Sequence, residues 1–256
     1  MAYNALQKLT DNIGALEIPF PLNEGDVPTS MQLEQLRKYS GFGGIKAVLF
    51  GQGSYDNWTS QGASQADLKL FDPVQRLYSL IKNYRPEDYD SICDSLKNST
   101  LTAFYTPGFV PDVLYLSLKN IDYQPTFLYE PSAGAGIFID QALSHFPNLD
   151  QIKAVEKDLL TAIVLQAISR SYQVAAEVQA IGFEQTELTD EGQADLMVSN
   201  IPFGNFRVHD PMLISEDPVL GKRIHNYFFA KGISKIADGG LMAFITTDAF
   251  LYSPTN

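Results

Sequence analysis

A short apolar strand that ends in an acid and runs into a glycine turn constrains the fold of this chain more than any other feature. Residues 127–139 read Phe-Leu-Tyr-Glu-Pro-Ser-Ala-Gly-Ala-Gly-Ile-Phe-Ile. The first apolar run predicts a buried strand ending at Glu130, and the apolar segment after Gly136 predicts a helix. Glycine permits the tight turn between them. Because open α/β sheets bind ligands outside the carboxyl ends of their strands, we expect a ligand at this turn.

The same strand-then-helix pattern continues along the rest of the chain. The segment Gln-Ile-Lys-Ala-Val at 151–155 predicts the next strand, and residues 159–169 predict the helix that follows it. This spacing is that of a β-α-β unit, which is about 30 residues long. We therefore predict an α/β fold with a parallel sheet, in which a helix over 226–237 precedes the last strand. The predicted strands are 126–130, 151–155, 178–181, 194–199 and 241–246.

The glycine turn does not fit two common nucleotide-binding motifs. The dinucleotide motif Gly-x-Gly-x-x-Gly requires a third glycine where this chain has Ile139, and the Gly-Lys-Ser/Thr of the P-loop is absent. A second acid, Glu156, follows strand 151–155 and should therefore lie at the end of the strand next to Glu130. There its carboxylate can accept hydrogen bonds from both hydroxyls of a ribose. A solvated loop at 156–158 is the alternative interpretation.

Asn200-Ile201-Pro202-Phe203 directly follows the apolar run 194–199, which predicts a buried strand. An exocyclic amine on an aromatic ring is a poor nucleophile, because its lone pair is delocalised into the ring. The Asn200 side-chain carbonyl and the backbone carbonyl of Ile201 can accept both amine hydrogens and free that lone pair. Pro202 stiffens the loop, and Phe203 offers a stacking face to a base turned out of its duplex. An ordinary turn is the alternative interpretation.

Together with a fourth segment, these motifs resemble a known enzyme family. Phe104-Tyr105-Thr106-Pro107 precedes the first strand. The order F-Y-T-P, E-P-S-A-G-A-G, Glu156 and N-I-P-F resembles the Rossmann-like amino-methyltransferase superfamily, in its DNA adenine-N6 branch of gamma-type and type I enzymes. The resemblance covers the chain from about residue 100 to the C-terminus. The chain departs from the family's pattern at Ile201, where a second proline is commoner, and at 183–184, where a Gly-Asp pair is commoner.

The resemblance implies S-adenosylmethionine as the cofactor and a role for each motif. Gly134 and Gly136 would approach its methionine part, with Glu130 near its amino group and Glu156 on its ribose. The other cofactor-binding residues that the resemblance implies are Tyr105 and Thr106 over the methionine end, Pro131 in the turn, and Phe183 and Glu184 beside the adenine. The implied catalytic residues are Asn200, Ile201, Pro202 and Phe203. Locally, Thr106 and Pro107 also fit the N-cap and first position of a helix.

The implied reaction is transfer of a methyl group from S-adenosylmethionine to the N6 amine of adenine in DNA, as in restriction-modification systems. Amino methylation of RNA adenine or of a protein glutamine is one alternative, because an amide nitrogen poses the same lone-pair problem. A fragment that binds cofactor or partners without turnover is another. The family's sheets normally continue past a fifth strand and lead to a DNA-recognition domain. We therefore expect a sheet truncated after strand 5, with DNA contacts made by a domain outside this chain.

Residues 1–100 are predicted to form a mainly helical region ahead of a catalytic core at 101–256. Helical patterns run over 31–39, 73–83 and 86–96, and a loop rich in Gly, Ser, Asn and Gln is expected at 51–63. The segment Tyr-Ser-Gly-Phe-Gly-Gly-Ile-Lys-Ala-Val-Leu-Phe at 39–50 resembles the region ahead of the methylase part in very large helicase–methylase proteins of mobile elements. A glycine stop between two helices is the alternative.

Composition and charge narrow the expected partners. The net charge is −12, most of it within residues 101–199, whereas DNA binders usually present a basic face. This favours DNA recognition from elsewhere. The single Cys93 and three scattered histidines predict neither a disulfide nor a metal site. No apolar run approaches the ~20 residues of a membrane span, and no secretory signal is visible, so we expect a soluble, cytoplasmic protein.

Overall fold

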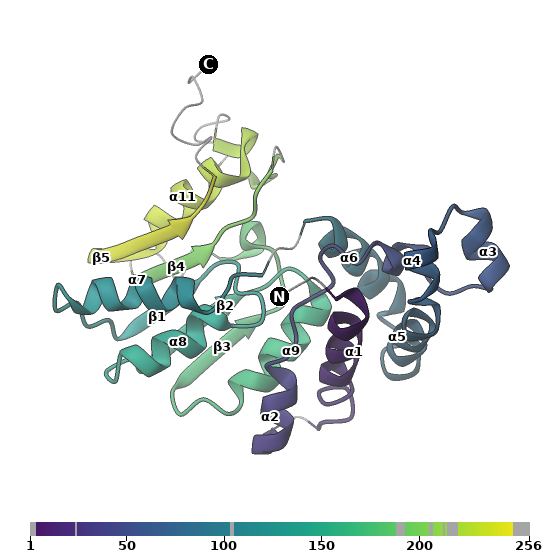
Figure 1. The fold of residues 1–256 in the computed structure, drawn as a ribbon. Coiled ribbons are helices and arrows are strands. Elements are labelled where there is room, and N and C mark those ends of the chain that lie inside the picture. Colours follow the sequence, from purple (N-terminus) through teal and green to yellow (C-terminus); the bar gives the residue numbers. More distant parts are fainter. Residues whose placement is uncertain are drawn as a thin grey trace. The chain divides into compact units, whose positions relative to one another are not determined.

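A computed structural model describes residues 4–23, 25–102, 105–187, 193–204, 207–211, 213 and 220–247 (Figure 1). Contacts divide the chain into two compact units. The helical unit consists of residues 1–105 and 158–171, and the sheet unit consists of residues 106–157 and 172–256. The expected division into a helical region at 1–100 and a catalytic core at 101–256 remains a prediction.

The N-terminal region is helical, as predicted. Side-chain caps begin several of its helices, because a Ser, Thr, Asn or Asp just before the helix accepts a hydrogen bond from a backbone N–H of the first turn. The elements of the helical unit are α1 (Ala5–Leu16), α2 (Ser30–Leu36), η1 (Lys46–Phe50), α3 (Tyr55–Ser60), α4 (Gln65–Leu68), α5 (Phe71–Tyr84), α6 (Tyr89–Thr102) and α9 (Leu159–Ser169).

The expectation of a loop over residues 51–63 was wrong, because this segment contains α3. Ser54 caps the helix by accepting a backbone hydrogen bond. Trp58 is fully buried, and its ring packs against those of Phe50 and Phe71. Burial of one large aromatic side chain therefore outweighs the loop-forming composition around it.

The sheet unit contains a parallel sheet of five described strands in the order β3-β2-β1-β4-β5 (Figure 1). This is the predicted α/β fold, with the strand order of Rossmann-like methyltransferase sheets. The strands are β1 (Phe127–Glu130), β2 (Gln151–Val155), β3 (Ala175–Gln179), β4 (Ala194–Asn200) and β5 (Ile236–Ile245). The other elements are α7 (Phe109–Lys119), α8 (Ile137–His145), η2 (Phe183–Gln185), η4 (Leu220–Lys222) and α11 (Ile224–Lys235). The strand order reverses between β1 and β4, and such a reversal is where open α/β sheets bind ligands.

β3 and β5 both begin earlier than predicted. β3 spans Ala175–Gln179 instead of 178–181, because pairing with the whole length of β2 fixes its register. β5 begins at Ile236, where the helix was expected to continue, because Ile236 pairs with Ala194 of β4. Gly239, with φ of +80°, accommodates a register shift within this strand. The hydrophobic pattern of a segment does not identify the strand with which it pairs, and that neighbouring strand decides where the segment's own strand begins.

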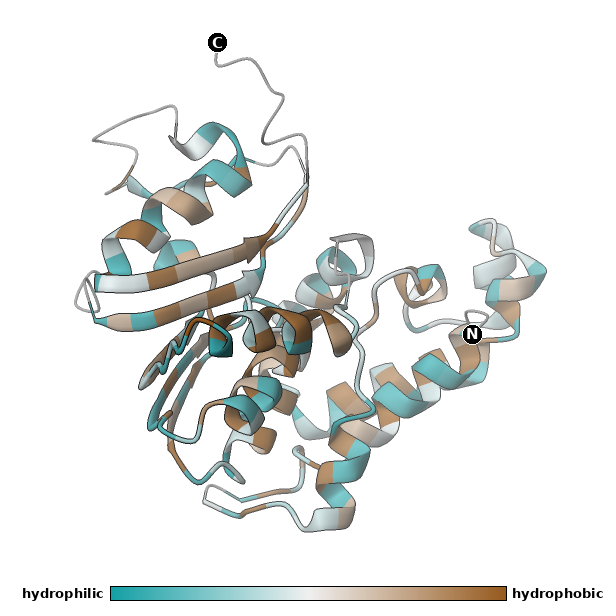
Figure 2. Cartoon of the chain, turned by 60° about the vertical axis from the view of Figure 1, so that its left-hand side comes forward, coloured by the Kyte–Doolittle hydropathy of each residue, from teal (hydrophilic) through white to brown (hydrophobic). Residues whose placement is uncertain are grey.

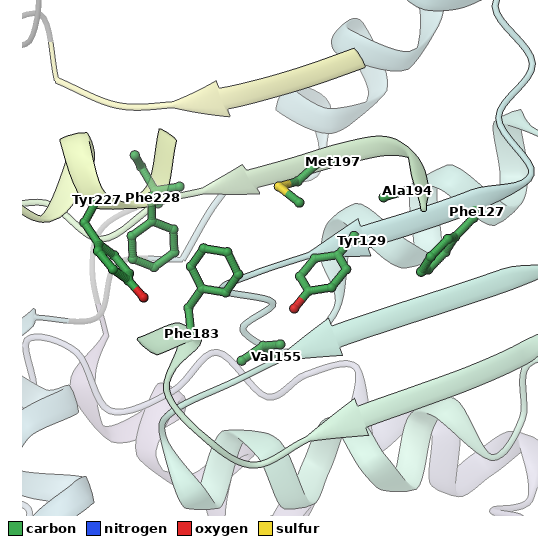
Figure 3. Packing of buried hydrophobic residues seen from close by; sticks show 9 residues of the cluster. Phe127, Tyr129, Val155, Phe183, Ala194, Met197, Tyr227 and Phe228 are labelled. Carbon is green, nitrogen blue, oxygen red and sulfur yellow. The ribbon is translucent and has the colours of Figure 1, made fainter. Parts of the chain in front are cut away.

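An aromatic cluster forms the core on one face of the sheet (Figure 3). Phe183 of η2 packs against Tyr129 of β1 and against Tyr227 and Phe228 of α11, with ring centroids 5.1 to 6.1 Å apart. Figure 2 shows apolar residues, in brown, along the strands of the sheet. Because Tyr129 directly precedes Glu130, this core fixes the end of β1 from which the glycine turn starts.

α9 connects β2 to β3 along the chain, yet by its contacts it groups with the helical unit. It packs against α1, α2 and α6. Ser95 Oγ accepts a hydrogen bond from Leu159 N at 3.0 Å and donates to Asp158 Oδ2 at 3.2 Å. Tyr39 Oη lies 3.1 Å from Thr161 Oγ1. The helix therefore belongs by packing to residues far from it in sequence.

Candidate functional site

The turn after β1 uses glycine where the backbone is left-handed. Gly134 and Gly136 have φ of +55° and +86°, a conformation that residues with a side chain rarely adopt. Ala133 N donates to the Val155 carbonyl at 2.9 Å, which attaches the turn to the end of β2. α8 begins at Ile137 without a side-chain cap. The first N–H groups of a helix have no partners inside it, so this turn can offer backbone donors to a ligand.

Two acids meet at this turn. Glu130 ends β1 and Glu156 follows β2, and these residues are 1% and 9% exposed. Glu156 Oε2 accepts a hydrogen bond from Gly134 N at 2.7 Å. Glu130 Oε2 is buried without a hydrogen-bond partner among the described residues. Burial and the charge of Glu156 raise the pKa of Glu130 well above its usual range.

The two acids of this turn fit the polar groups of S-adenosylmethionine. An ammonium group can bind the unsatisfied oxygen of Glu130 and offset its repulsion with Glu156. Carboxylate oxygens of Glu156 can accept from ribose hydroxyls. Pro131, which is also buried, fixes the backbone directly after Glu130. The same acids would disfavour a phosphate, because two buried carboxylates repel an anion.

Phe183 and Glu184 lie in η2, after β3. Phe183 is buried in the aromatic cluster, and Lys231 Nζ lies 5.4 Å from its ring centroid. Glu184 Oε1 lies 2.6 Å from Lys157 Nζ, and Lys157 directly follows Glu156. The structure thus gives Phe183 a position in the core and connects Glu184 to the loop of Glu156. Their place beside an adenine ring remains a prediction.

Asn200 is held at the end of β4 by backbone and side-chain hydrogen bonds. β4 pairs with β5 as far as Asn200 and Ile245, and Ile201 N donates to the Ile245 carbonyl at 3.2 Å. Asn200 Nδ2 donates to Thr106 Oγ1 at 2.9 Å. Asn200 Oδ1 is buried and has no hydrogen-bond partner in the part of the chain that the structure describes. One end of the amide is therefore engaged, and the other can still accept.

The Asn200 loop and the glycine turn are joined. Ser199 is fully buried, and its Oγ donates to the Ser132 carbonyl at 3.1 Å. Ile201 is buried within the aromatic cluster, whereas Pro202 and Phe203 are partly exposed. The structure therefore brings the predicted catalytic loop and the predicted cofactor turn together at the carboxyl ends of β1 and β4. The link through Ser132 and Ser199 was not predicted, because a serine at a strand end has no distinctive pattern.

Thr106 and Tyr105 belong to different units. The interpretation of Thr106 and Pro107 as the start of a helix was wrong, because α7 begins at Phe109 with Gly108 as its N-cap. The Thr106 hydroxyl bonds to the Asn200 side chain instead. Tyr105 belongs to the helical unit, where its hydroxyl lies 3.1 Å from Thr161 Oγ1. Its contact with a cofactor remains a prediction, and Phe104 lies outside the described residues.

A buried polar cluster between α11 and the segment after the Asn200 loop was not predicted. Asp210 Oδ2 accepts hydrogen bonds from Lys231 Nζ at 2.9 Å and from Tyr227 Oη at 2.7 Å. Burial raises the pKa of Asp210, but the bonds from Tyr227 and Lys231 outweigh this and lower it. Lys231 also donates to the Thr186 carbonyl at 3.3 Å. The sequence signal that could have predicted this cluster is Lys231, which follows Tyr227 by one helical turn on the apolar face of α11.

The described ranges contain neither a cluster of metal-ligating side chains nor a helix that could span a membrane. No group of three or more His, Cys, Asp and Glu side chains there is arranged to hold a metal ion. No helix in this part of the chain has the length and hydropathy to cross a membrane. His145 lies 2.8 Å from Asp112 and packs beside Tyr115 and Phe146, so its contacts are those of a packed residue.

The fold is similar to solved structures of S-adenosylmethionine-dependent methyltransferases. A protein from Listeria monocytogenes that is assigned to class I of these enzymes aligns with a TM-score of 0.51 at 15% sequence identity, over 98% of this chain and 76% of its own. The methyltransferase subunit of a type I restriction-modification system from Streptococcus thermophilus aligns with a TM-score of 0.51 at 13% identity, over 90% of this chain and 58% of its own. No protein-family model and no curated protein matches the chain. At these identities, the similarity establishes the fold.

Proposed function

We propose that this chain, with its methyltransferase fold, transfers a methyl group from S-adenosylmethionine to the N6 amine of adenine in DNA. One observation carries the proposal. Asn200 Oδ1 is buried without a partner among the described residues, at the end of β4 beside the glycine turn. Buried polar groups are nearly always hydrogen-bonded, so an exception indicates a place for a donor from outside the chain. The exocyclic amine of adenine is such a donor.

The Asn200 loop addresses the low nucleophilicity of a conjugated amine. S-adenosylmethionine supplies an activated methyl group on a sulfonium. Asn200 Oδ1 and the carbonyl of Ile201 accept the two amine hydrogens and so direct the nitrogen lone pair out of the ring plane. No general base is needed before attack, because the amine can lose its proton after the methyl group has transferred. Pro202 limits the movement of the loop, and Phe203 stacks on the base.

The glycine turn and its acids are assigned to the cofactor. Gly134 and Gly136 allow close backbone approach, Glu130 accepts from the ammonium group, and Glu156 accepts from the ribose hydroxyls. The support for this assignment is the chemistry of the acids, one of which has an unsatisfied oxygen. The remaining residues that we assign to the cofactor pocket are Tyr105, Thr106, Pro131, Phe183 and Glu184.

DNA is favoured as the substrate by the F-Y-T-P segment and by the fold. One protein with a similar fold is the methyltransferase subunit of a type I restriction-modification system, and this chain spans 58% of its length. The net charge of −12 opposes strong binding to a polyanion by this chain alone. We therefore assign sequence recognition to a separate domain or subunit.

Methyl transfer from tritiated S-adenosylmethionine tests the proposal. The natural protein, offered DNA, RNA and protein pools, should label DNA at adenine N6. Asn200→Ala should lower turnover by about 100- to 1000-fold, the cost of removing one preorganised hydrogen-bonding group from a transition state. Its affinity for S-adenosylmethionine, measured by calorimetry, should stay close to that of the wild type because the Asn200 carbonyl faces the base. Asn120→Ala is the matched control, because it makes the same substitution at an exposed asparagine just after α7.

The other outcomes separate the competing functions. Label in RNA or in glutamine with the same loss in Asn200→Ala would keep the catalytic loop and change the substrate. Cofactor binding without label in any pool would indicate a non-catalytic binding domain. Full activity of Asn200→Ala on DNA would make the N-I-P-F segment an ordinary turn.

A further inference from the structure

We propose that Thr106 is a positioning residue that decides which end of the Asn200 amide faces the substrate amine. The inference rests on the proposed function and adds a residue to it. An Asn side chain has two ends of nearly the same shape and opposite chemistry, a carbonyl that accepts and an NH2 group that donates. Only the carbonyl can accept a hydrogen from an amine. In the opposite orientation, the NH2 group of Asn200 would face the hydrogens of the substrate amine and oppose the reaction.

Thr106 engages the nitrogen end of this amide. Asn200 Nδ2 donates to Thr106 Oγ1 at 2.9 Å, and Oδ1 is the end left buried without a partner among the described residues. The backbone on either side of the amide is fixed as well. Ser199 is bonded to the Ser132 carbonyl, and Ile201 N is bonded to the Ile245 carbonyl. With the backbone held, the side-chain orientation is the freedom that remains. A hydroxyl can bond to either end of an amide, but it can only accept, and so binds the nitrogen end, when its own hydrogen is donated elsewhere.

The Thr106 hydroxyl is available for this task because the following helix does not use it. α7 begins at Phe109, and its N-cap Gly108 makes no side-chain cap hydrogen bond. Pro107 limits the backbone conformations between Thr106 and the helix. A hydroxyl that accepts one hydrogen bond still has its own hydrogen to donate. Thr106 can therefore hold Asn200 and donate to the cofactor at the same time.

Two substitutions separate positioning from packing. Thr106→Val keeps the shape of the side chain and removes the acceptor, whereas Thr106→Ser keeps the acceptor and removes a methyl group. We expect Thr106→Val to lower kcat for DNA methylation by about 100-fold, the cost of a misplaced reacting group. Its dissociation constant for S-adenosylmethionine should rise by about 10-fold at most, the effect of losing one neutral hydrogen bond. Thr106→Ser should recover most of the lost kcat. Thr126→Val is the matched control, because it removes a similar hydroxyl hydrogen bond, to Asp195, at the opposite end of β1.

Amide NMR gives a second readout that does not depend on turnover. The side-chain NH2 signal of Asn200, identified by its loss in Asn200→Ala, should show one proton protected from solvent exchange in the wild type and in Thr106→Ser. That protection should disappear in Thr106→Val. It should persist in Thr126→Val.

Each remaining outcome has one meaning. A Thr106→Val enzyme with wild-type kcat and weakened cofactor binding would show that Thr106 acts on the cofactor alone. Equal losses in Thr106→Val and Thr106→Ser would show a packing role. Both results overturn the inference and leave the proposed function intact. A wild-type protein that binds S-adenosylmethionine but methylates no amine would instead overturn the proposed function, and the positioning role with it.

Discussion

Glu130 is a buried acid placed beside a second acid, Glu156. A buried carboxylate is unfavourable unless a proton or a cation compensates it. Here burial and the charge of Glu156 raise the pKa of Glu130 well above its usual range. The residue is therefore suited to bind a cation, such as the ammonium group of the proposed cofactor, at the expense of the stability of the free protein, a trade-off that is common at binding sites.

We predict that Glu130→Gln stabilises the free protein and weakens cofactor binding. Below the unfolded-state pKa of about 4.3, both states hold the proton and no penalty exists. As the pH rises toward the raised folded-state pKa, the unfolded state releases its proton first, so wild-type stability falls. The stability gain of Glu130→Gln should therefore grow as the pH rises from 5 to 8 in urea denaturation.

The control for this prediction is Glu34→Gln, on the exposed side of α2. Its free energy of unfolding should match that of the wild type at pH 5 and at pH 8. Calorimetry should show that Glu130→Gln loses roughly 1.5–3 kcal/mol of cofactor affinity, the range for a hydrogen bond to a charged group. A Glu130→Gln protein that binds S-adenosylmethionine as tightly as the wild type would remove Glu130 from the site.

At the scale of elements, α11 is attached to the segment after the Asn200 loop through a buried ion pair. The side chains of Lys231 and Asp210 are 3% and 6% exposed, with Nζ and Oδ2 2.9 Å apart. Replacing one partner of such a pair leaves the other as an uncompensated buried charge, which costs about 3–5 kcal/mol. Lys231→Met should therefore lower the free energy of unfolding by that amount. Urea denaturation followed by circular dichroism measures it.

Replacing both partners separates the charge from the packing. Lys231→Met combined with Asp210→Leu should recover part of the loss, because buried ion pairs and apolar pairs are often of similar stability. The recovery stays incomplete because the buried Tyr227 hydroxyl loses its acceptor. Lys119→Met, at the exposed end of α7, is the control and should change stability by less than about 0.5 kcal/mol. If Lys231→Met unfolded at the same urea concentration as the wild type, the pair would contribute nothing to holding α11.

At the scale of the whole molecule, α9 packs with helices that are far from it in chain order. It lies between two strands of the sheet unit in sequence, but it packs against α1, α2 and α6 of the helical unit. Most of its side chains are apolar and buried. The N-terminal residues are thus a structural requirement for a helix that belongs to the β-α-β order of the sheet.

We predict that residues 106–256 do not form a stable monomer on their own. Without α1, α2 and α6, the buried side chains of α9 would face water, and exposed apolar surface of that kind leads to association. Size-exclusion chromatography should show aggregates, and the shorter chain should bind the dye ANS. The 256-residue chain, prepared in parallel, should do neither. A cooperative unfolding transition and a monomeric elution volume for 106–256 would contradict the prediction.

The sequence by itself determined the α/β class, the parallel strands and the order of the motifs along them. These features depend on local patterns: apolar runs predict strands, glycine permits left-handed turns, and acids and amides mark strand ends. Strand ends were less accurate, as at β3 and β5, because pairing partners set them. α3 was missed because one buried tryptophan outweighed a polar composition.

Tertiary structure alone decided which distant groups meet. Thr106 fits a helix cap when only its neighbours are considered, yet its hydroxyl bonds to a side chain 94 residues away. Phe183 follows a strand along the chain, and only the packed structure places it in the aromatic cluster with Tyr227 and Phe228. α9 follows β2 and packs with the N-terminal helices. A local pattern encodes the conformation and the buried face of a segment, whereas the partner of that face is fixed only when the whole chain packs.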